Sequence, residues 1–311
     1  MNKKLLIMVG KKDEKKELFS KLITERLGKD IGVTLAVFSD LFIELDGNKI
    51  EVLIGDKDIR EFDLVYFRRI DHSLFPLSGS LAMCLDKFGI KYFDTKFKEI
   101  GAGGDKFTSL VKLSIAKVRV AKTIFCPREK ILEKKDLIIS KLNFPIIAKD
   151  TSAQGNTGIF VLKKEEDFEA LLKLREKRLS GTYVQFIFQQ FLQINREYRL
   201  LVLGNSVRVV HKKDKRSYKK LTVTYEVPDL ETEFVNIKQI PSSLKKISVK
   251  AAKILNIEIA GVDACQLEKD SVPIIIEVNR GPGFEYDTDK SPEIIEVADF
   301  LKNSLKNKWL R

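Results

Sequence analysis

Histidine, cysteine and tryptophan are scarce in this chain of 311 residues, which holds two histidines, three cysteines and one tryptophan. His72 and His211 do not supply a histidine-based triad, since no serine lies in a Gly-x-Ser-x-Gly elbow. Cys84, Cys126 and Cys265 are far apart and show no Cys-x-x-Cys spacing. The sequence therefore supports neither a disulfide framework nor a zinc site.

Long hydrophobic runs are also absent, and none approaches the roughly 20 residues needed to span a bilayer. The apolar residues 5–9 follow Lys3 and Lys4 as in a signal peptide, but a charged run begins at Lys11. We therefore interpret this segment as a first strand and expect a cytoplasmic protein with no membrane partner. The length allows two or three modest domains, each with its own core.

Positively charged residues outnumber negatively charged ones, which gives a net charge of +12 at pH 7. A solvated lysine-rich surface explains this excess, and so does an anionic partner such as a nucleotide, an acidic peptide or RNA. The most basic loop spans residues 212–220 and contains one aromatic residue, Tyr218. Stacking platforms for RNA are not evident there, so we do not expect a nucleic-acid partner. Whether this loop binds a substrate or only solvent stays open.

Residues 1–98 predict a small α/β unit. Its expected elements are a strand at 5–9, a helix at 13–27, a strand at 33–38, a hairpin formed by 41–45 and 50–54, and a strand at 63–67. The last of these strands ends in Arg68 and Arg69. Paired arginines at a strand end can bind carboxylates or phosphates, and a plain surface position explains them equally well.

In the middle segment, residues 101–158, two of the lysines and a small-residue loop could bind phosphates. After a glycine-rich joint at 101–104, Asp105 and Lys106 open a helix that we expect to reach about Lys117. A short buried strand then ends in Lys149, followed by the small-residue loop 150–158. Backbone N–H groups of such a loop can cradle phosphates, although an ordinary turn also explains the loop taken alone. Neither a P-loop nor a dinucleotide fingerprint is present.

The most informative stretch runs from residue 261 to residue 285. Two apolar runs separated by a polar turn predict a hairpin, in which period-two alternation places Glu277 and Asn279 on one face. Asp263 adds a second carboxylate from the first strand. Two carboxylates and a neutral carbonyl suit a magnesium ion that phosphates already coordinate in part. A second hairpin is predicted around Gly204-Asn205, with Glu197 and Arg199 on one face.

In this order and spacing, these residues together resemble the ATP-grasp superfamily, specifically ligases similar to the ribosomal-protein glutamate ligase RimK and to peptide-maturing ligases. The resemblance covers roughly residues 101–306. It implies an α/β (α+β) chain with the ATP-grasp fold, in which two α+β subdomains hold the nucleotide. The implied divisions are an N-terminal α/β pre-ATP-grasp domain at 1–100, a central subdomain with a phosphate flap at 101–182, and a C-terminal subdomain with a metal site at 183–311.

The resemblance also implies roles for residues that would touch the nucleotide. Lys106 and Lys149 match the lysines that reach the α- and β-phosphates. Segment 154–158 resembles the flap over the β- and γ-phosphates, and Glu197 matches an acidic position near the ribose. The flap and adenine positions in full are Gln154, Gly155, Gly158, Gln189, Gln190, Phe191 and Leu192, with Gln190 standing where the family usually has Glu.

Catalytic and metal positions follow in the same way. Arg199 matches the arginine that steadies the transferred phosphoryl group, and Lys149 shares this task. Arg216 resembles part of an Arg-Ser-Asn motif on the substrate side, although Tyr218 replaces the Asn. The positions that match the magnesium ligands are Asp263, Glu277 and Asn279.

The activity implied is an ATP-dependent carboxylate-amine ligase that forms an amide or peptide bond through an acylphosphate, releasing ADP and phosphate. The cofactors would be ATP and Mg²⁺, with Mn²⁺ as a second metal of the same class. The expected partners are a carboxylate and an amine, with an acidic amino acid, peptide or protein tail favoured by the basic loop. An ATP-grasp kinase of small molecules and a non-catalytic nucleotide sensor are the alternatives, and homo-oligomerisation stays open.

Overall fold

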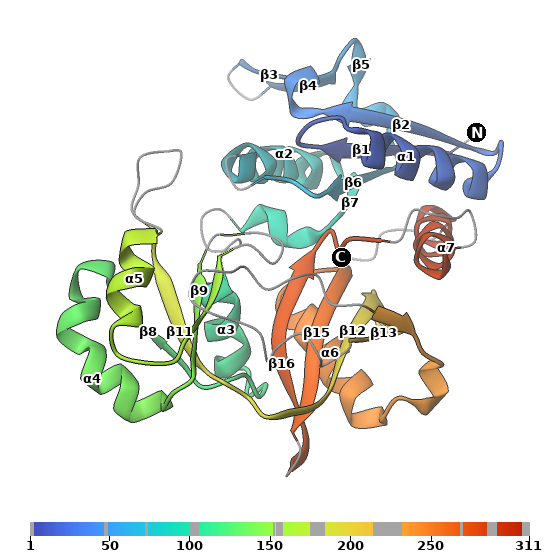
Figure 1. Cartoon of the computed structure of the whole chain (residues 1–311). Helices are drawn as coiled ribbons and strands as arrows, with labels where there is room; N and C mark the ends of the chain where they lie inside the picture. Colours follow the sequence, from blue (N-terminus) through green and yellow to red (C-terminus); the bar gives the residue numbers. More distant parts are fainter. Residues whose placement is uncertain are drawn as a thin grey trace.

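A computed structural model of the chain describes residues 3–46, 49–71, 74–99, 106–151, 153, 158–174, 184–213, 232–267, 270–284 and 291–306. The strands among these residues form four sheets. Figure 1 shows an upper part in blue, a green part at lower left, and an orange-to-red part at lower right. The mixed α/β class that the sequence predicts is confirmed.

The N-terminal residues form a parallel sheet with the strand order β2-β1-β6-β7. Its strands and helices are β1 (Lys3–Val9), α1 (Glu14–Leu27), β2 (Ile31–Val37), β6 (Leu64–Arg68), α2 (Phe75–Phe88) and β7 (Lys91–Phe93). Residues 5–9 of β1 are all buried, as expected for a parallel strand covered on both faces. Alternate residues of this strand pack with α1 on one face and with α2 on the other.

A second, smaller sheet lies beside the first and has the order β3-β4-β5. Its strands are β3 (Leu41–Asp46), β4 (Lys49–Ile54) and β5 (Lys57–Asp58). The predicted hairpin between the first two is therefore confirmed. Short 3-10 turns lie at Phe38–Asp40, Ile59–Glu61, Thr95–Lys98, Arg128–Lys130 and Ile237–Gln239.

The central sheet is antiparallel and has the order β10-β9-β11-β8. Its elements are β8 (Thr123–Phe125), α4 (Ile131–Leu142), β9 (Ile146–Asp150), β10 (Ile159–Leu162), α5 (Asp167–Leu174) and β11 (Phe186–Gln190). Ile146 and Ala148 of β9 pack under α4 and α5. Because side chains alternate along a strand, Ile147 and Lys149 lie on the face that these helices leave uncovered.

The C-terminal sheet is antiparallel, with the order β14-β13-β12-β15-β16. Its elements are β12 (Ile194–Leu203), β13 (Ser206–Lys213), β14 (Thr232–Phe234), α6 (Ser242–Ile254), β15 (Ile259–Leu267), β16 (Asp270–Arg280) and α7 (Pro292–Lys306). α6 covers one face of this sheet. α7 covers part of the other face and packs against α1, so it joins the C-terminal sheet to the N-terminal core (Figure 1).

Both predicted C-terminal hairpins are present, as β12-β13 and β15-β16. The helix expected from Lys106 is α3 (Lys106–Ile115), which packs against α6 and β16. The sequence analysis did not predict α2. Among the helices of the described residues, none combines the length and the apolarity that crossing a membrane requires.

A reciprocal set of hydrogen bonds joins the N-terminal domain to β15. Asp94 Oδ1 accepts the backbone N–H groups of Glu258 and Ile259 at 2.9 and 3.0 Å. In return, the Glu258 carboxylate accepts the backbone N–H and the hydroxyl of Thr95 at 2.8 and 2.5 Å. Burial, and then the charge of Glu258, raises the pKa of Asp94 to about 8.

Replacing Asp94 with asparagine should make the free energy of unfolding less dependent on pH between pH 5 and pH 8. A carboxyl group with a raised pKa contributes stability below its unfolded value of 3.8, and this contribution is lost as the pH rises through its folded value of about 8. Asparagine keeps an Oδ1 acceptor and does not titrate. In denaturant unfolding, the wild type should lose at least about 1 kcal/mol more than Asp94→Asn over this interval.

The matched control for this prediction is Asp30→Asn, at an exposed position of the same domain. This control should follow the wild-type dependence on pH. If Asp94→Asn also follows it, Asp94 does not titrate in this interval and the interpretation of this buried carboxyl is wrong.

Candidate active site

A row of charged side chains crosses three neighbouring strands of the C-terminal sheet. Arg199 of β12 is paired with Asp263 of β15, and Asp263 is paired with Glu277 of β16. Asn279 is paired with Gly261, one step further along the same two strands. Directly paired residues share a face of a sheet, so these side chains form one continuous row. The convergence predicted for Asp263, Glu277 and Asn279 is present in the register, and their metal-binding role stays a prediction.

Gly261 of β15 allows the loop that follows β16 to approach this strand closely. A Cβ atom at Gly261 would lie 2.7 Å from Cβ of Pro282, in the loop that follows β16. Any other side chain would push this loop away from β15. The loop therefore folds back over the strand that carries Asp263, and closes one end of the row.

The same face of the sheet is apolar at its other end. Leu201, Leu203, Val209 and Ile259 are buried in one core with α7 and α1. The charged row begins only where this cover ends, at Arg199. The sheet thus presents one end of this face to the N-terminal core and the other to the candidate site.

Asp263 is the hub of the row. Its carboxylate accepts hydrogen bonds from Nε and Nη2 of Arg199, both at 3.0 Å, and lies 3.0 Å from Nζ of Lys213. Nδ2 of Asn279 donates to the same carboxylate at 3.2 Å. Burial alone would raise the pKa of Asp263, but Lys213 and Arg199 outweigh it and hold the pKa well below its usual range.

Lys213 is a residue of this cluster that the sequence analysis did not single out. Its Nζ lies 2.7 Å from Glu197 Oε1 as well as 3.0 Å from Asp263. Burial would lower the pKa of Lys213, and the two carboxylates raise it above its usual value. Asp263 and Glu197 thus share one ammonium group between them.

The reason that Lys213 was missed is a change of register in the β12-β13 hairpin. Counted from the turn at Gly204-Asn205, a regular ladder would pair Glu197 with Lys212. The register shifts by one residue between Leu201 and Val202, so Glu197 is paired with Lys213 instead. A one-residue shift moves every later side chain to the opposite face. No local signal in the sequence marks this bulge.

Two lysines from outside the C-terminal sheet belong to the same cluster, Lys149 of β9 in the central sheet and Lys106 at the start of α3. Lys149 is 8% exposed, and burial lowers its pKa, while the charge of Glu277 acts to raise it and that of Lys106 acts to lower it. Nζ of Lys106 lies 3.8 Å from Glu277 Oε1 and donates to the carbonyl of Ala153. Side chains from the central sheet, from α3 and from the C-terminal sheet therefore meet in one place.

The segment proposed to meet adenine lies where the central sheet passes into the C-terminal one. Gln189 is buried, and its amide donates to the Thr123 hydroxyl at 2.8 Å within the sheet. The backbone N–H of Gln190 donates to the carbonyl of Lys122 at 3.0 Å, and its side chain is exposed. The half-buried link formed by Phe191 and Leu192 then leads into β12.

Of the flap positions, Gly158 is described and Gln154 and Gly155 are not. Gly158 has a φ of +76°, and a Cβ there would lie 2.7 Å from Cβ of Ala153 and 2.9 Å from Cβ of Asp150. Only glycine fits this turn back into β10. Arg216 also lies outside the described residues, as does most of the basic loop 212–220.

The donor set of the cluster fits a magnesium-polyphosphate group. Four cations, Lys106, Lys149, Arg199 and Lys213, face three carboxylates, Glu197, Asp263 and Glu277. The described residues hold no group of three or more His, Cys, Asp or Glu that could bind a metal unaided. One or two protein carboxylates suffice for a magnesium ion that phosphates also coordinate, and the cations suit the phosphates themselves.

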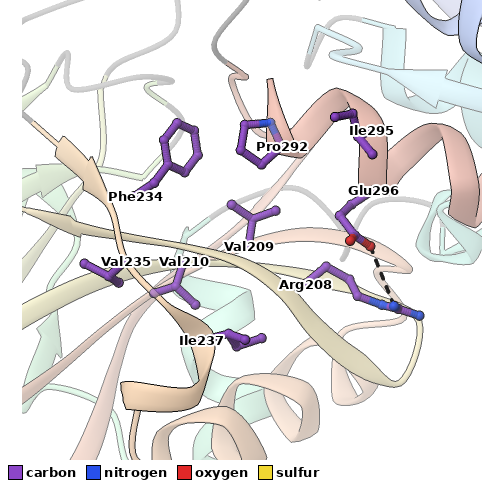
Figure 2. Close-up of a pocket in the computed structure, with 9 residues that line it drawn as sticks. All are labelled: Arg208, Val209, Val210, Phe234, Val235, Ile237, Pro292, Ile295 and Glu296. Carbon is purple, nitrogen blue, oxygen red and sulfur yellow. Dashed lines mark ion pairs between the residues drawn. The ribbon is translucent and has the colours of Figure 1, made fainter. Parts of the chain in front are cut away.

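A cavity of about 280 Å³ lies elsewhere, between β13 and α7. Figure 2 shows its mainly apolar lining, with an ion pair of 3.6 Å between Arg208 and Glu296 at one side. The residues that line it include none of the candidate site residues described above. It is therefore distinct from the charged cluster.

This charged cluster, built by two sheets and the start of α3, fits an enzyme of the ATP-grasp class. The family model of the RimK-like ATP-grasp domain matches residues 103–299, and the chain belongs to this family. The family resemblance stated from the sequence is thereby confirmed.

Two relatives with names that describe their activity are also ligases. The chain is 25% identical over 248 residues to a D-alanine–D-alanine ligase of Clostridium botulinum (strain Alaska E43 / Type E3), a match that covers 77% of this chain and 80% of the relative. It is 27% identical over 246 residues to a probable alpha-L-glutamate ligase of Coxiella burnetii (strain RSA 493 / Nine Mile phase I), covering 78% and 77%. The protein is accordingly an ATP-dependent ligase of the carboxylate-amine type.

A solved structure shows the same fold. The ATP-grasp ligase PsnB, complexed with a minimal precursor, Mg and ADP, superimposes with a TM-score of 0.67 at 15% sequence identity. The match covers 97% of this chain and 97% of PsnB. ATP and magnesium are typical of the family.

Proposed function

We propose that this ligase forms an amide or peptide bond through an acylphosphate, and that it acts on an acidic amino acid, peptide or protein tail. The observation that carries the proposal is the single cluster in which Lys106 and Lys149 meet Asp263, Glu277 and the side chains around them. The cluster has the charges that a nucleotide and its metal require, and the described site needs no protein nucleophile for this chemistry.

Asp263, Glu277 and Asn279 would hold the magnesium ion, whose charge would offset that of the phosphates. Lys106 and Lys149 would bind phosphate oxygens from the side of the central sheet. Arg199 is fixed by two hydrogen bonds to Asp263, so its guanidinium is oriented before substrate arrives. Such preorganised charge stabilises a transferring phosphoryl group without reorganisation during the reaction.

The proposed reaction has two steps. An oxygen of the substrate carboxylate attacks the γ-phosphorus of ATP, and ADP leaves as the acylphosphate forms. The amine then attacks the acyl carbon, phosphate leaves, and the amine nitrogen loses a proton. The chain's own contribution is positioning and charge, supplied by the lysines and Arg199.

An acidic substrate is supported by the charge of the chain and by the name of one of the two relatives above. The net charge is +12, and the loop 212–220, which includes Arg216, is the most basic part of the sequence. The relative from Coxiella burnetii is named as a probable glutamate ligase. These observations favour glutamate or a glutamate-rich peptide over a neutral substrate.

The test is a screen for ADP release in the presence of MgATP, with L-glutamate and short glutamyl peptides as carboxylates and a panel of amino acids as amines. We expect ADP release that depends on both substrates, and a product whose mass is the sum of the two less one water. A phosphorylated acceptor would identify a kinase instead. ADP release with neutral substrates alone would contradict the acidic substrate, and no ADP release with any pair would indicate a nucleotide sensor.

A further inference from the structure

The N-terminal parallel sheet has a topological switch point between β1 and β6. Its order is β2-β1-β6-β7, so the chain leaves β1 toward one edge of the sheet and leaves β6 toward the other. In open parallel sheets, ligands bind outside the carboxyl ends of the strands at such a point. Gly10 follows β1 and Arg69 follows β6, and a Cβ on Gly10 would lie 4.0 Å from the Arg69 carbonyl oxygen. Arg69 therefore lies at the switch point.

The same residue lies against the exit of the candidate metal strand. Arg69 has a φ of +50°, a left-handed conformation that is uncommon outside glycine and often marks functional sites. A Cβ on Gly281 would lie 2.8 Å from the Arg69 nitrogen and 3.2 Å from its Cγ. Gly281 comes two residues after Asn279. The switch point of the N-terminal sheet thus lies against Gly281, two residues along the chain from Asn279 at the end of the charged row of the C-terminal sheet.

The two neighbouring arginines have different environments. Arg68 is fully buried, with its guanidinium 4.4 Å from the ring centres of both Phe19 and Phe284. Its Nη1 donates to the carbonyl of Pro282 at 2.9 Å, which fixes the loop after β16 against β6. Arg69 is exposed, and no carboxylate of the described residues lies within ion-pair distance of it. Full burial contradicts the surface position that the sequence allowed for Arg68, and both alternatives remain open for Arg69.

We propose that Arg69 binds a carboxylate group of the substrate at this switch point, and so selects acidic substrates. The planar guanidinium matches a carboxylate with two parallel hydrogen bonds, which a lysine cannot reproduce. The buried Arg68 and the contact with Gly281 hold the Arg69 backbone in place, so the recognition group is positioned before binding. This inference rests on the proposed ligase function, and names the residue that recognises its substrate.

Calorimetric titration tests the assignment with the full chain saturated with MgADP. The probes are L-glutamate, triglutamate, triglutamate with an amidated C-terminus, and triglutamine. We expect Arg69→Ala to weaken binding of triglutamate by about 10- to 100-fold, and Arg69→Lys to weaken it less. The affinity for MgADP should not change, because Arg69 does not belong to the charged cluster. The amidated peptide distinguishes a terminal carboxylate from a side-chain carboxylate as the bound group, and triglutamine should bind weakly.

The matched control is Arg26→Ala, an exposed arginine in the last turn of α1. It should bind all probes as the wild type does. Equal affinities of the wild type and Arg69→Ala for triglutamate would overturn the assignment, and so would a wild type that binds none of the probes. Formation of an amide product in the substrate screen would still support the ligase function in either case, so the two failures are distinguishable.

Discussion

Asp263→Asn should lower the free energy of unfolding by about 2 to 3 kcal/mol and reduce ATP turnover by on the order of a thousandfold. The substitution leaves Arg199 and Lys213 without the carboxylate that both contact at 3.0 Å. Removal of one partner from a buried group of charges is costly because the remaining charges are not solvated. The side chain of Arg199 is 35% exposed, so we expect a loss somewhat below the roughly 3 to 5 kcal/mol typical of fully buried pairs.

The stability lost in Asp263→Asn should become smaller as the pH falls. A carboxyl group with a lowered pKa contributes stability above its unfolded value of 3.8, and that contribution is lost as the pH falls toward its folded value. The difference in unfolding free energy between wild type and Asp263→Asn should therefore be large at pH 7 and shrink below about pH 4. Asp299→Asn, at an exposed position on α7, is the control. A difference that stays constant down to pH 3 would contradict the charged hub.

Glu277→Ala should abolish magnesium-dependent ATP turnover while leaving the fold intact. Glu277 is 26% exposed at its side chain, and its contact with Lys106 is long at 3.8 Å, so its removal should cost less than about 1 kcal/mol of stability. Its proposed role is instead to provide an oxygen to the metal, and loss of one such electrostatic contact costs about 3 kcal/mol in the barrier, or at least a hundredfold in rate. ADP release and thermal unfolding measure the two effects separately.

The control for this variant is Glu233→Ala, whose carboxylate is 66% exposed and pairs with Lys212 at the edge of the same sheet. It should turn over ATP at the wild-type rate. Undiminished turnover by Glu277→Ala, at a magnesium concentration that limits the wild type, would show that the metal assignment is wrong.

The sequence predicts the charged row because the row depends on strand alternation. Glu277 and Asn279 are two residues apart on one strand, so they share a face whatever the rest of the chain does. Alternation also places Lys149 on the face of β9 opposite to Ile146 and Ala148, which pack under α4 and α5. Placement of Lys149 beside Glu277 required the family resemblance, since no local pattern reports how two sheets pack together.

Other features depend on events that the sequence does not mark. Lys213 enters the cluster only because of the bulge in the β12-β13 hairpin, and a regular ladder would have selected Lys212. Arg68 and Arg69 are identical in sequence terms, and the structure separates them because two rings from distant segments enclose the first. Tertiary packing decides both cases.

A crystal structure of the chain with magnesium and a non-hydrolysable ATP analogue tests the central claim most directly. We predict a metal ion bound by oxygens of Asp263, Glu277 and Asn279 and by the phosphates, with Lys106 and Lys149 on the phosphate oxygens. Binding of magnesium would then require Asp263 to exchange part of its contact with Arg199 and Lys213 for the metal. A nucleotide bound away from β15 and β16, or a metal ion that contacts none of these three side chains, would contradict the account.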